Sequence, residues 1–113
     1  MEDHLSMTFE EVSKMATGFP GVTEEISYGA PSFRVGKAML ARLREDEVFV
    51  LKCDPSERDG LIAAQPDTFF LTDHYAKHPY VLVNLESADP DQMRTLIERA
   101  WKMVAPKSFT EPD

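Results

Sequence analysis

Residues 32–52 read SFRVGKAMLARLREDEVFVLK, and this stretch decides the fold. Gly36-Lys37 interrupts it once, and Glu45-Asp46-Glu47 interrupts it again. The segments between are β-branched, aromatic, or alternate between apolar and charged residues, as strands do. Connections this short join antiparallel neighbours, because a parallel crossover needs a dozen or more residues. The stretch therefore predicts three successive antiparallel strands, at residues 32–35, 38–44 and 48–52.

Strand patterns also lie on both sides of this stretch. Residues 24–28 precede it across the turn residues Gly29-Ala30-Pro31. Residues 68–72 and 80–85 form a second candidate pair, joined by residues 73–79. Together these patterns predict an antiparallel sheet of about six strands.

Three helix starts are marked by capping residues. Thr8 is a candidate N-cap with Glu11 at N3, which forms a capping box, and Met7 and Val12 occupy the positions of a hydrophobic staple. Asp54-Pro55 and Asp89-Pro90 open the second and third helices in the same way, with Glu57 expected to reach back to the start of the second. We expect these helices to end near Gly18, Pro66 and Pro106.

The third helix carries the clearest apolar stripe in the chain. Its apolar residues recur at helical spacing and should pack on the sheet: Met93, Leu96, Ile97, Ala100, Trp101 and Val104. Arg94, Glu98 and Lys102 should face water. The element order is α-ββββ-α-ββ-α, which predicts an α+β fold of two layers, with three helices on one face of the sheet. We expect one domain over residues 1–113, with its core at about 8–107.

Composition restricts the class of protein. The chain has 113 residues, 42% of them apolar and 28% charged, which is typical of a folded domain. Cys53 is the single cysteine, so no internal disulfide can form. The sequence shows neither an apolar run long enough to cross a bilayer nor a signal peptide. We therefore expect a cytoplasmic protein without a membrane partner, as a monomer or weak dimer.

Four blocks in this order resemble the YjbR/MmcQ family over roughly residues 8–107. They are SYGAPSF at 27–33, KCDPSE at 52–57, the segment from Phe69 to Val83, and AWKMVAPK at 100–107. The resemblance implies a CyaY-like (frataxin-like) fold. It also implies DNA binding through hairpins that resemble a double wing. In many relatives a basic residue or His precedes the aromatic that aligns with Tyr80, whereas this chain has Pro79.

The candidate nucleic-acid-binding residues come from a basic stretch in an acidic chain. The net charge is −8, but residues 28–44 contain no acid. Strand alternation should turn Met39, Ala41 and Leu43 towards the helices and leave Arg42 and Arg44 on the open face of the sheet. The alternative is a solvated strand face balanced by Glu45-Asp46-Glu47. The candidates for DNA contact are Arg34, Lys37, Arg42, Arg44 and Lys52.

A second hypothesis is a binding module for a small ligand or a protein partner. Residues from the family-like blocks lie in loops that lead into strands, where a pocket with a few polar groups can form. The alternative is an ordinary hairpin corner around Gly29. The candidate ligand-binding residues are Tyr28, Pro31, Phe33, His74, Tyr75 and Tyr80, with Lys52 beside them.

Motifs for catalysis and metal binding are missing from the sequence. There is no phosphate-binding glycine loop, no nucleophile elbow and no paired catalytic acid and base, so we expect no enzyme and no cofactor. His74 and His78 have a spacing that binds metal on a helix, but Pro79 disfavours helix at His78. We therefore expect no metal site, and we expect Cys53 to be a buried thiol.

Overall fold

A computed structural model describes residues 6–27, 29–44 and 48–106 of the chain. The described α-helices are α1 (Phe9–Thr17), α2 (Pro55–Ala64) and α3 (Pro90–Val104). The strands are β1 (Val22–Ser27), β2 (Ala30–Val35), β3 (Ala38–Leu43), β4 (Phe49–Lys52), β5 (Phe69–Phe70) and β6 (Tyr80–Val83). Two short 3-10 helices, η1 (Asp73–Tyr75) and η2 (Leu85–Ser87), flank β6.

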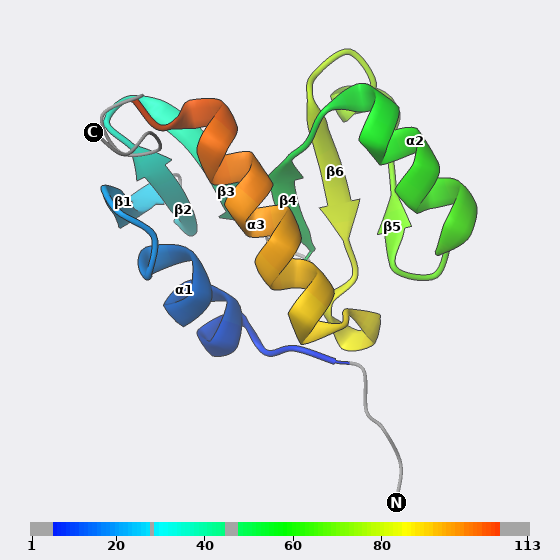
Figure 1. The fold of residues 1–113 in the computed structure, drawn as a ribbon, viewed down its shortest axis with the longest axis horizontal. Helices are drawn as coiled ribbons and strands as arrows, with labels where there is room; N and C mark the ends of the chain where they lie inside the picture. The colour runs from blue at the N-terminus through cyan, green and yellow to red at the C-terminus, as the bar shows by residue number, and fades with distance from the viewer. Residues whose placement is uncertain (1–5, 28, 45–47, 107–113) are drawn as a thin grey trace, which may run out of the picture.

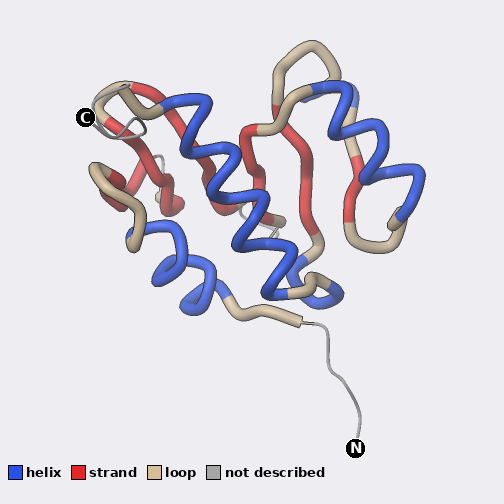
Figure 2. Tube along the Cα trace, viewed as in Figure 1, coloured by secondary structure: helices blue, strands red, loops and turns tan. Residues whose placement is uncertain are grey.

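The six strands form one antiparallel sheet in the order β1-β2-β3-β4-β6-β5. After α2 the chain forms β5 at the edge of the sheet. It then forms β6, which lies between β4 and β5 and pairs with both. The three α-helices lie in a layer on one side of this sheet (Figures 1 and 2). The predicted α+β class, element order and two-layer architecture are confirmed.

The main core fills the space between the sheet and the helices. The sheet supplies Phe33, Phe49 and Leu51, and α3 supplies Ile97 and Trp101. Burying such side chains away from water is the principal force that holds the two layers together. The sheet therefore has one face in the core and a second face turned away from the α-helices.

The capping signals of α1 and α3 are confirmed. The Thr8 side chain accepts from the Glu11 amide, and the Glu11 carboxylate accepts from the Thr8 amide at 2.8 Å. Met7 and Val12 are both buried, as the staple requires. In α3 the Asp89 side chain accepts from the Asp91 amide, and the apolar stripe up to Trp101 is buried.

The expectation for the start of α2 is corrected in one respect. Pro55 is the first helical residue, but the Asp54 side chain makes no capping hydrogen bond. The Glu57 carboxylate does not reach back to the helix start; it pairs with Arg99 of α3. The start of α2 therefore lacks a side-chain cap and instead makes a salt bridge to a neighbouring helix.

A β-bulge corrects the expected alternation in β3. Phe33 is paired with Ala41 and Arg34 with Met39, so Leu40 is the extra residue between them. Leu40 is fully buried in the main core, whereas Met39 shares the other face of the sheet with Arg34. Ala41 and Leu43 do face the helices. The prediction for Met39 was wrong because a bulge shifts the side-chain alternation by one residue.

The β2–β3 turn is confirmed, whereas the turn before β2 is shorter than expected. Val35 is paired with Ala38, which leaves Gly36 and Lys37 as a two-residue turn. Gly36 has a φ of 62°, which glycine adopts without strain. β2 begins at Ala30, so Pro31 lies in the strand and not in the turn. The expected turn at residues 45–47 lies outside the described residues.

Candidate functional site

The face of the sheet opposite the helices is the candidate site. Directly paired residues of antiparallel strands point to the same face. Arg42 is paired with Val50, which is paired with Leu82. Val50 and Leu82 form a second apolar cluster with Tyr75 of η1, and none of the described members of this cluster comes from α1, α2 or α3. We call this surface the open face.

Three cations project from neighbouring strands of the open face, and we call them the basic patch: Arg34 of β2, Arg42 of β3 and Lys52 of β4. Arg42 opposes Val50, and Lys52 is the next residue of β4 on that face, so the two are diagonal neighbours. Such neighbours lie ~7–8 Å apart. The Arg34 guanidinium donates to the Lys37 carbonyl at 3.3 Å, which draws it towards the β2–β3 turn. All three side chains are partly accessible to water.

An aromatic cluster of His74, Tyr75 and Tyr80 borders the basic patch. The His74 and Tyr75 ring centroids are 4.8 Å apart, and those of Tyr75 and Tyr80 are 6.1 Å apart, both in edge-to-face geometry. The Lys52 ammonium lies over the Tyr80 ring, 5.4 Å from its centroid. This distance allows a cation–π interaction. His74 is exposed, Tyr80 is half-buried and Tyr75 is buried.

The environment of Tyr80 changes its acidity. Burial raises the pKa of the Tyr80 phenol above its ordinary value of 10.0, and Tyr75 raises it further. The positive charge of Arg34 acts in the opposite direction. Tyr80 therefore stays a neutral aromatic ring across the physiological pH range, with its hydroxyl protonated.

Acids also border the open face. Glu25 of β1 is paired with Ser32, the residue of β2 that opposes Arg42, and its side chain is exposed. Asp73 is exposed in η1 beside His74. Glu24 points to the other side, where its carboxylate accepts from the Ser13 hydroxyl at 2.5 Å. The positive charge of the open face is therefore concentrated on β2, β3 and β4, with an acid at each margin.

Arg58 of α2 is a structural contributor that sequence reasoning missed. Its side chain is only 7% exposed, and its Nη1 donates to the carbonyls of His78 at 2.8 Å and Tyr80 at 3.2 Å. These bonds tie the loop before β6 to α2 and fix the backbone that carries Tyr80. The sequence did carry a signal for this role: Arg58 lies in the first turns of a short helix with few apolar residues.

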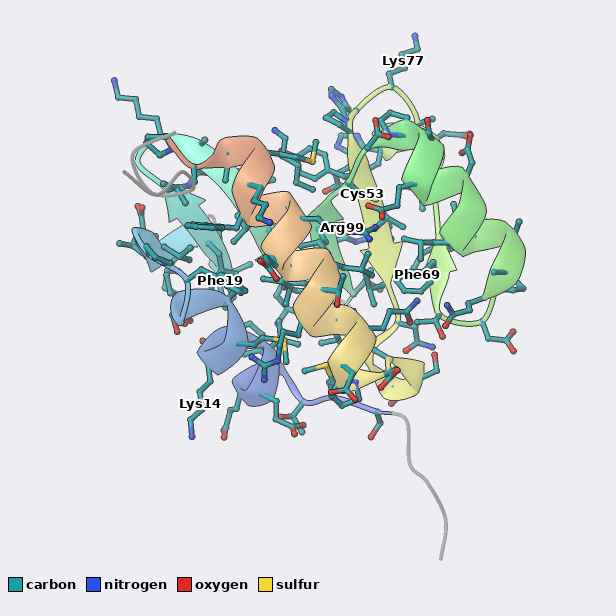
Figure 3. All side chains as sticks on the ribbon, viewed as in Figure 1. Lys14, Phe19, Cys53, Phe69, Lys77 and Arg99 are labelled. Atoms are coloured by element: carbon teal, nitrogen blue, oxygen red, sulfur yellow. The ribbon has the colours of Figure 1, made fainter. Side chains whose placement is uncertain are left out.

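Cys53 is a buried thiol, as predicted, with 3% of its surface exposed. Burial raises the pKa of the Cys53 thiol from 9.0 to about 11, and the carboxylate of Asp54 adds to this rise. Arg58 and Arg99 oppose it. Figure 3 shows Cys53 and Arg99 in the region between α3 and α2. The thiol is therefore protonated and poorly nucleophilic near neutral pH.

The structure separates the residues of the proposed ligand pocket. His74, Tyr75 and Tyr80 come together beside Lys52. Phe33 is fully buried in the main core, in contact with Phe9 and Phe49, on the face opposite Tyr80. Pro31, two residues before Phe33 in β2, points to that same side. Tyr28 lies outside the described residues, and three of the five predicted residues that the structure describes share a surface.

The remaining basic candidates lie at hairpin positions. Lys37 is exposed in the β2–β3 turn. Arg44 follows the end of β3, and its amide donates to the Val48 carbonyl at 2.8 Å. In the loop before β6, Lys77 extends away from the body of the protein (Figure 3). Lys37 and Lys77 are therefore open to contact by a large ligand at the margins of the open face.

Two hollows in the described surface lie away from the open-face residues. One, of about 490 Å³, lies between α1 and the start of α3 and is bordered by Met15, Phe19 and Arg94. The other, of about 400 Å³, lies near the start of α1 and is bordered by Phe9, Leu43 and Asn84. Neither is lined by the basic patch or the aromatic cluster. These two hollows therefore belong to other parts of the described surface.

Neither a metal-binding cluster nor a membrane-spanning helix occurs among the described residues. No three histidine, cysteine or acidic side chains among them are grouped so as to hold a metal ion. None of the helices in the described ranges has the length and apolar character needed to cross a membrane.

The fold and the open face define a small α+β domain with a helix layer on one side and a cationic, aromatic sheet surface on the other. The chain belongs to the YjbR family, whose model matches residues 17–103. Relatives include Uncharacterized protein Rv2570 of Mycobacterium tuberculosis and Uncharacterized protein Mb2600 of Mycobacterium bovis. Each is 28% identical over 123 residues, covering 92% of this chain and 93% of the relative.

A solved structure shares the fold. The crystal structure of Deinococcus radiodurans protein DR2400, described with a DUF419 domain, superposes with a TM-score of 0.76. The two sequences are 21% identical, and the match covers 98% of this chain and 87% of that one. The likeness supports the architecture of the whole described domain.

Proposed function

We propose that this protein is a non-enzymatic binding module for nucleic acid and that its contact surface is the open face. The observation that carries the proposal is the grouping of Arg34, Arg42 and Lys52 on adjacent strands of one face. The chain as a whole has 20 acidic and 12 basic residues, so a local group of cations is unexpected by composition. Cations of this kind neutralise phosphates.

The rest of the surface supports the same assignment. The basic patch is not neutralised by ion pairs among the described residues: Arg34 donates to a backbone carbonyl, and Lys52 lies over an aromatic ring. Lys37 is exposed in the β2–β3 turn and Lys77 extends from the loop before β6 (Figure 3), so both can contact a phosphate chain that runs past the sheet. Glu25 and Asp73 limit the favourable surface to the central strands.

A charge-reversal pair tests the proposal. The variant Arg34→Glu/Arg42→Glu removes two cations from the open face, and Lys14→Glu/Arg94→Glu removes two from exposed positions of α1 and α3. Each substitution changes the charge by −2, so both double variants go from −8 to −12. Fluorescence anisotropy with labelled single-stranded and duplex DNA at low salt measures binding.

We expect the open-face variant to lose about tenfold or more in affinity, because two phosphate contacts become repulsive. The helix-layer variant should bind nearly as the wild type does, since its charges lie on the other side of the sheet. Circular dichroism confirms that both variants fold. Equal losses in the two variants would show that net charge, and not the open face, controls binding; absence of binding by the wild type would overturn the proposal.

A further inference from the structure

The open face has an apolar centre that a phosphate backbone alone does not explain. Across the sheet Arg42 is followed by Val50, Leu82 and Phe70 on the same face. Tyr75 packs against this centre, and Tyr80 and Phe70 remain partly exposed. The outer surface of a duplex offers charged phosphates and sugars, so apolar and aromatic groups gain little from it.

Single strands present a different surface. Their bases are free to turn outward and stack on aromatic side chains while cations track the phosphates. The open face places an aromatic ring for a base beside a cation for a phosphate, because Tyr80 and Lys52 are directly paired across β6 and β4. Arg42 lies one diagonal step further along the sheet.

We propose that the nucleic acid bound by the open face is single-stranded, with one base stacked on Tyr80 and the adjoining phosphates held by Lys52 and Arg42. This inference rests on the proposed function and specifies its ligand. The Lys52 ammonium lies over the Tyr80 ring in the free protein. On binding, the base takes the ring face and the ammonium moves to a phosphate, so each group exchanges one partner for another.

Contacts with neighbouring residues hold the Tyr80 ring in place before any base binds. Arg58 holds the carbonyls of His78 and Tyr80, and Tyr75 packs edge-on against the Tyr80 ring. A ring fixed in this way loses little conformational freedom when a base stacks on it. The exposed ring of His74, edge-on to Tyr75, offers a further stacking surface at the margin.

The test compares three DNA probes with similar numbers of phosphates: an oligothymidylate of about 12 nucleotides, an abasic strand of the same length, and a short duplex. The wild type should bind the oligothymidylate about tenfold more tightly than the abasic strand, because stacking of one base has about this effect. The duplex should resemble the abasic strand, since neither offers a free base.

Two variants test whether the preference for oligothymidylate over the abasic strand comes from the Tyr80 ring. Tyr80→Leu keeps an apolar side chain but no aromatic face, so it should bind oligothymidylate no better than the abasic strand. Tyr80→Phe keeps the ring and should retain the wild-type preference. If the wild type binds all three probes equally, the single-strand inference is overturned and the proposed function stands. If it binds none of them, both are overturned; this comparison does not depend on whether a variant folds.

Discussion

At the scale of single residues, Cys53 and Tyr80 show how the sheet assigns roles that the sequence leaves open. Both roles follow from position: Cys53 directly follows β4 and lies in the main core, whereas Tyr80 begins β6 on the open face. The buried thiol was predictable, because lone cysteines are commonly buried. The neighbours of Tyr80 were only partly predictable. Arg58, which donates a hydrogen bond to the Tyr80 carbonyl, lies 22 residues away along the chain.

The raised pKa of Cys53 predicts a specific pH dependence of stability. Its value goes from 9.0 in the unfolded chain to about 11 in the fold. The folded state therefore holds the thiol proton more tightly, and stability falls as the pH rises from 9 towards 11. Urea unfolding of the wild type and Cys53→Ser isolates this effect, because other titrating groups cancel. The unfolding free energy of the wild type minus that of Cys53→Ser should be constant below pH 9 and should fall above it. A difference that stays constant up to pH 11 would contradict the raised pKa of Cys53.

At the scale of elements, capping and periodicity predicted α1 and α3 well because these signals are local. Thr8 and Asp89 each bond an amide within three residues, so nothing distant is needed to place them. Asp54 looked equivalent in sequence but makes no such bond, and the Glu57 carboxylate pairs with Arg99 on another helix. A contact of that kind is set by tertiary packing and leaves no local pattern.

In the strands, too, local sequence patterns predicted the elements but not the features that depend on pairing with distant residues. The short connections predicted the antiparallel order of β1 to β4, and the sheet confirms it. Period-two alternation also placed Arg42 on the open face. It failed at Met39, because the bulge at Leu40 depends on how β3 is paired with β2. The candidate site was therefore predicted as a list of residues, but its division between two faces required the register.

The packing of α3 predicts a large effect at Trp101. Its side chain is 6% exposed, its ring lies 5.5 Å from that of Phe19, and its indole donates to the Pro20 carbonyl at 2.8 Å. Trp101→Ala should therefore lower the unfolding free energy by ~3–5 kcal/mol. That is a large part of the ~5–10 kcal/mol expected for a domain of this size.

Met103 provides the control on the same helix. It is 46% exposed, so Met103→Ala should change stability by less than about 0.5 kcal/mol. Chemical denaturation of both variants, monitored by circular dichroism, measures the two effects. A Trp101→Ala midpoint close to that of Met103→Ala would mean that the indole does not hold the end of α3 to the loop before β1.

At the scale of the whole molecule, net charge and local charge act in opposite directions on a polyanion. The protein carries −8, which repels nucleic acid at long range. On the proposed binding mode, contact at the open face would bring phosphates within a few ångströms of Arg34, Arg42 and Lys52, where nearby cations would outweigh distant acids. Salt screens distant charges more than close ones, so the long-range repulsion should weaken first as salt increases.

This opposition predicts a shallow salt dependence. For single-stranded DNA the slope of log Kobs against log salt is ~−0.7 for each phosphate neutralised. The three cations of the basic patch therefore predict a slope of about −2, and adding Lys37 and Arg44 predicts about −3.5. Anisotropy titrations of oligothymidylate at several salt concentrations measure it, and Arg42→Gln should make the slope shallower by about 0.7. A slope near −2 with no change in Arg42→Gln would place the phosphate contacts on another surface, whereas a loss of slope confined to open-face variants fixes the strand to β2, β3 and β4.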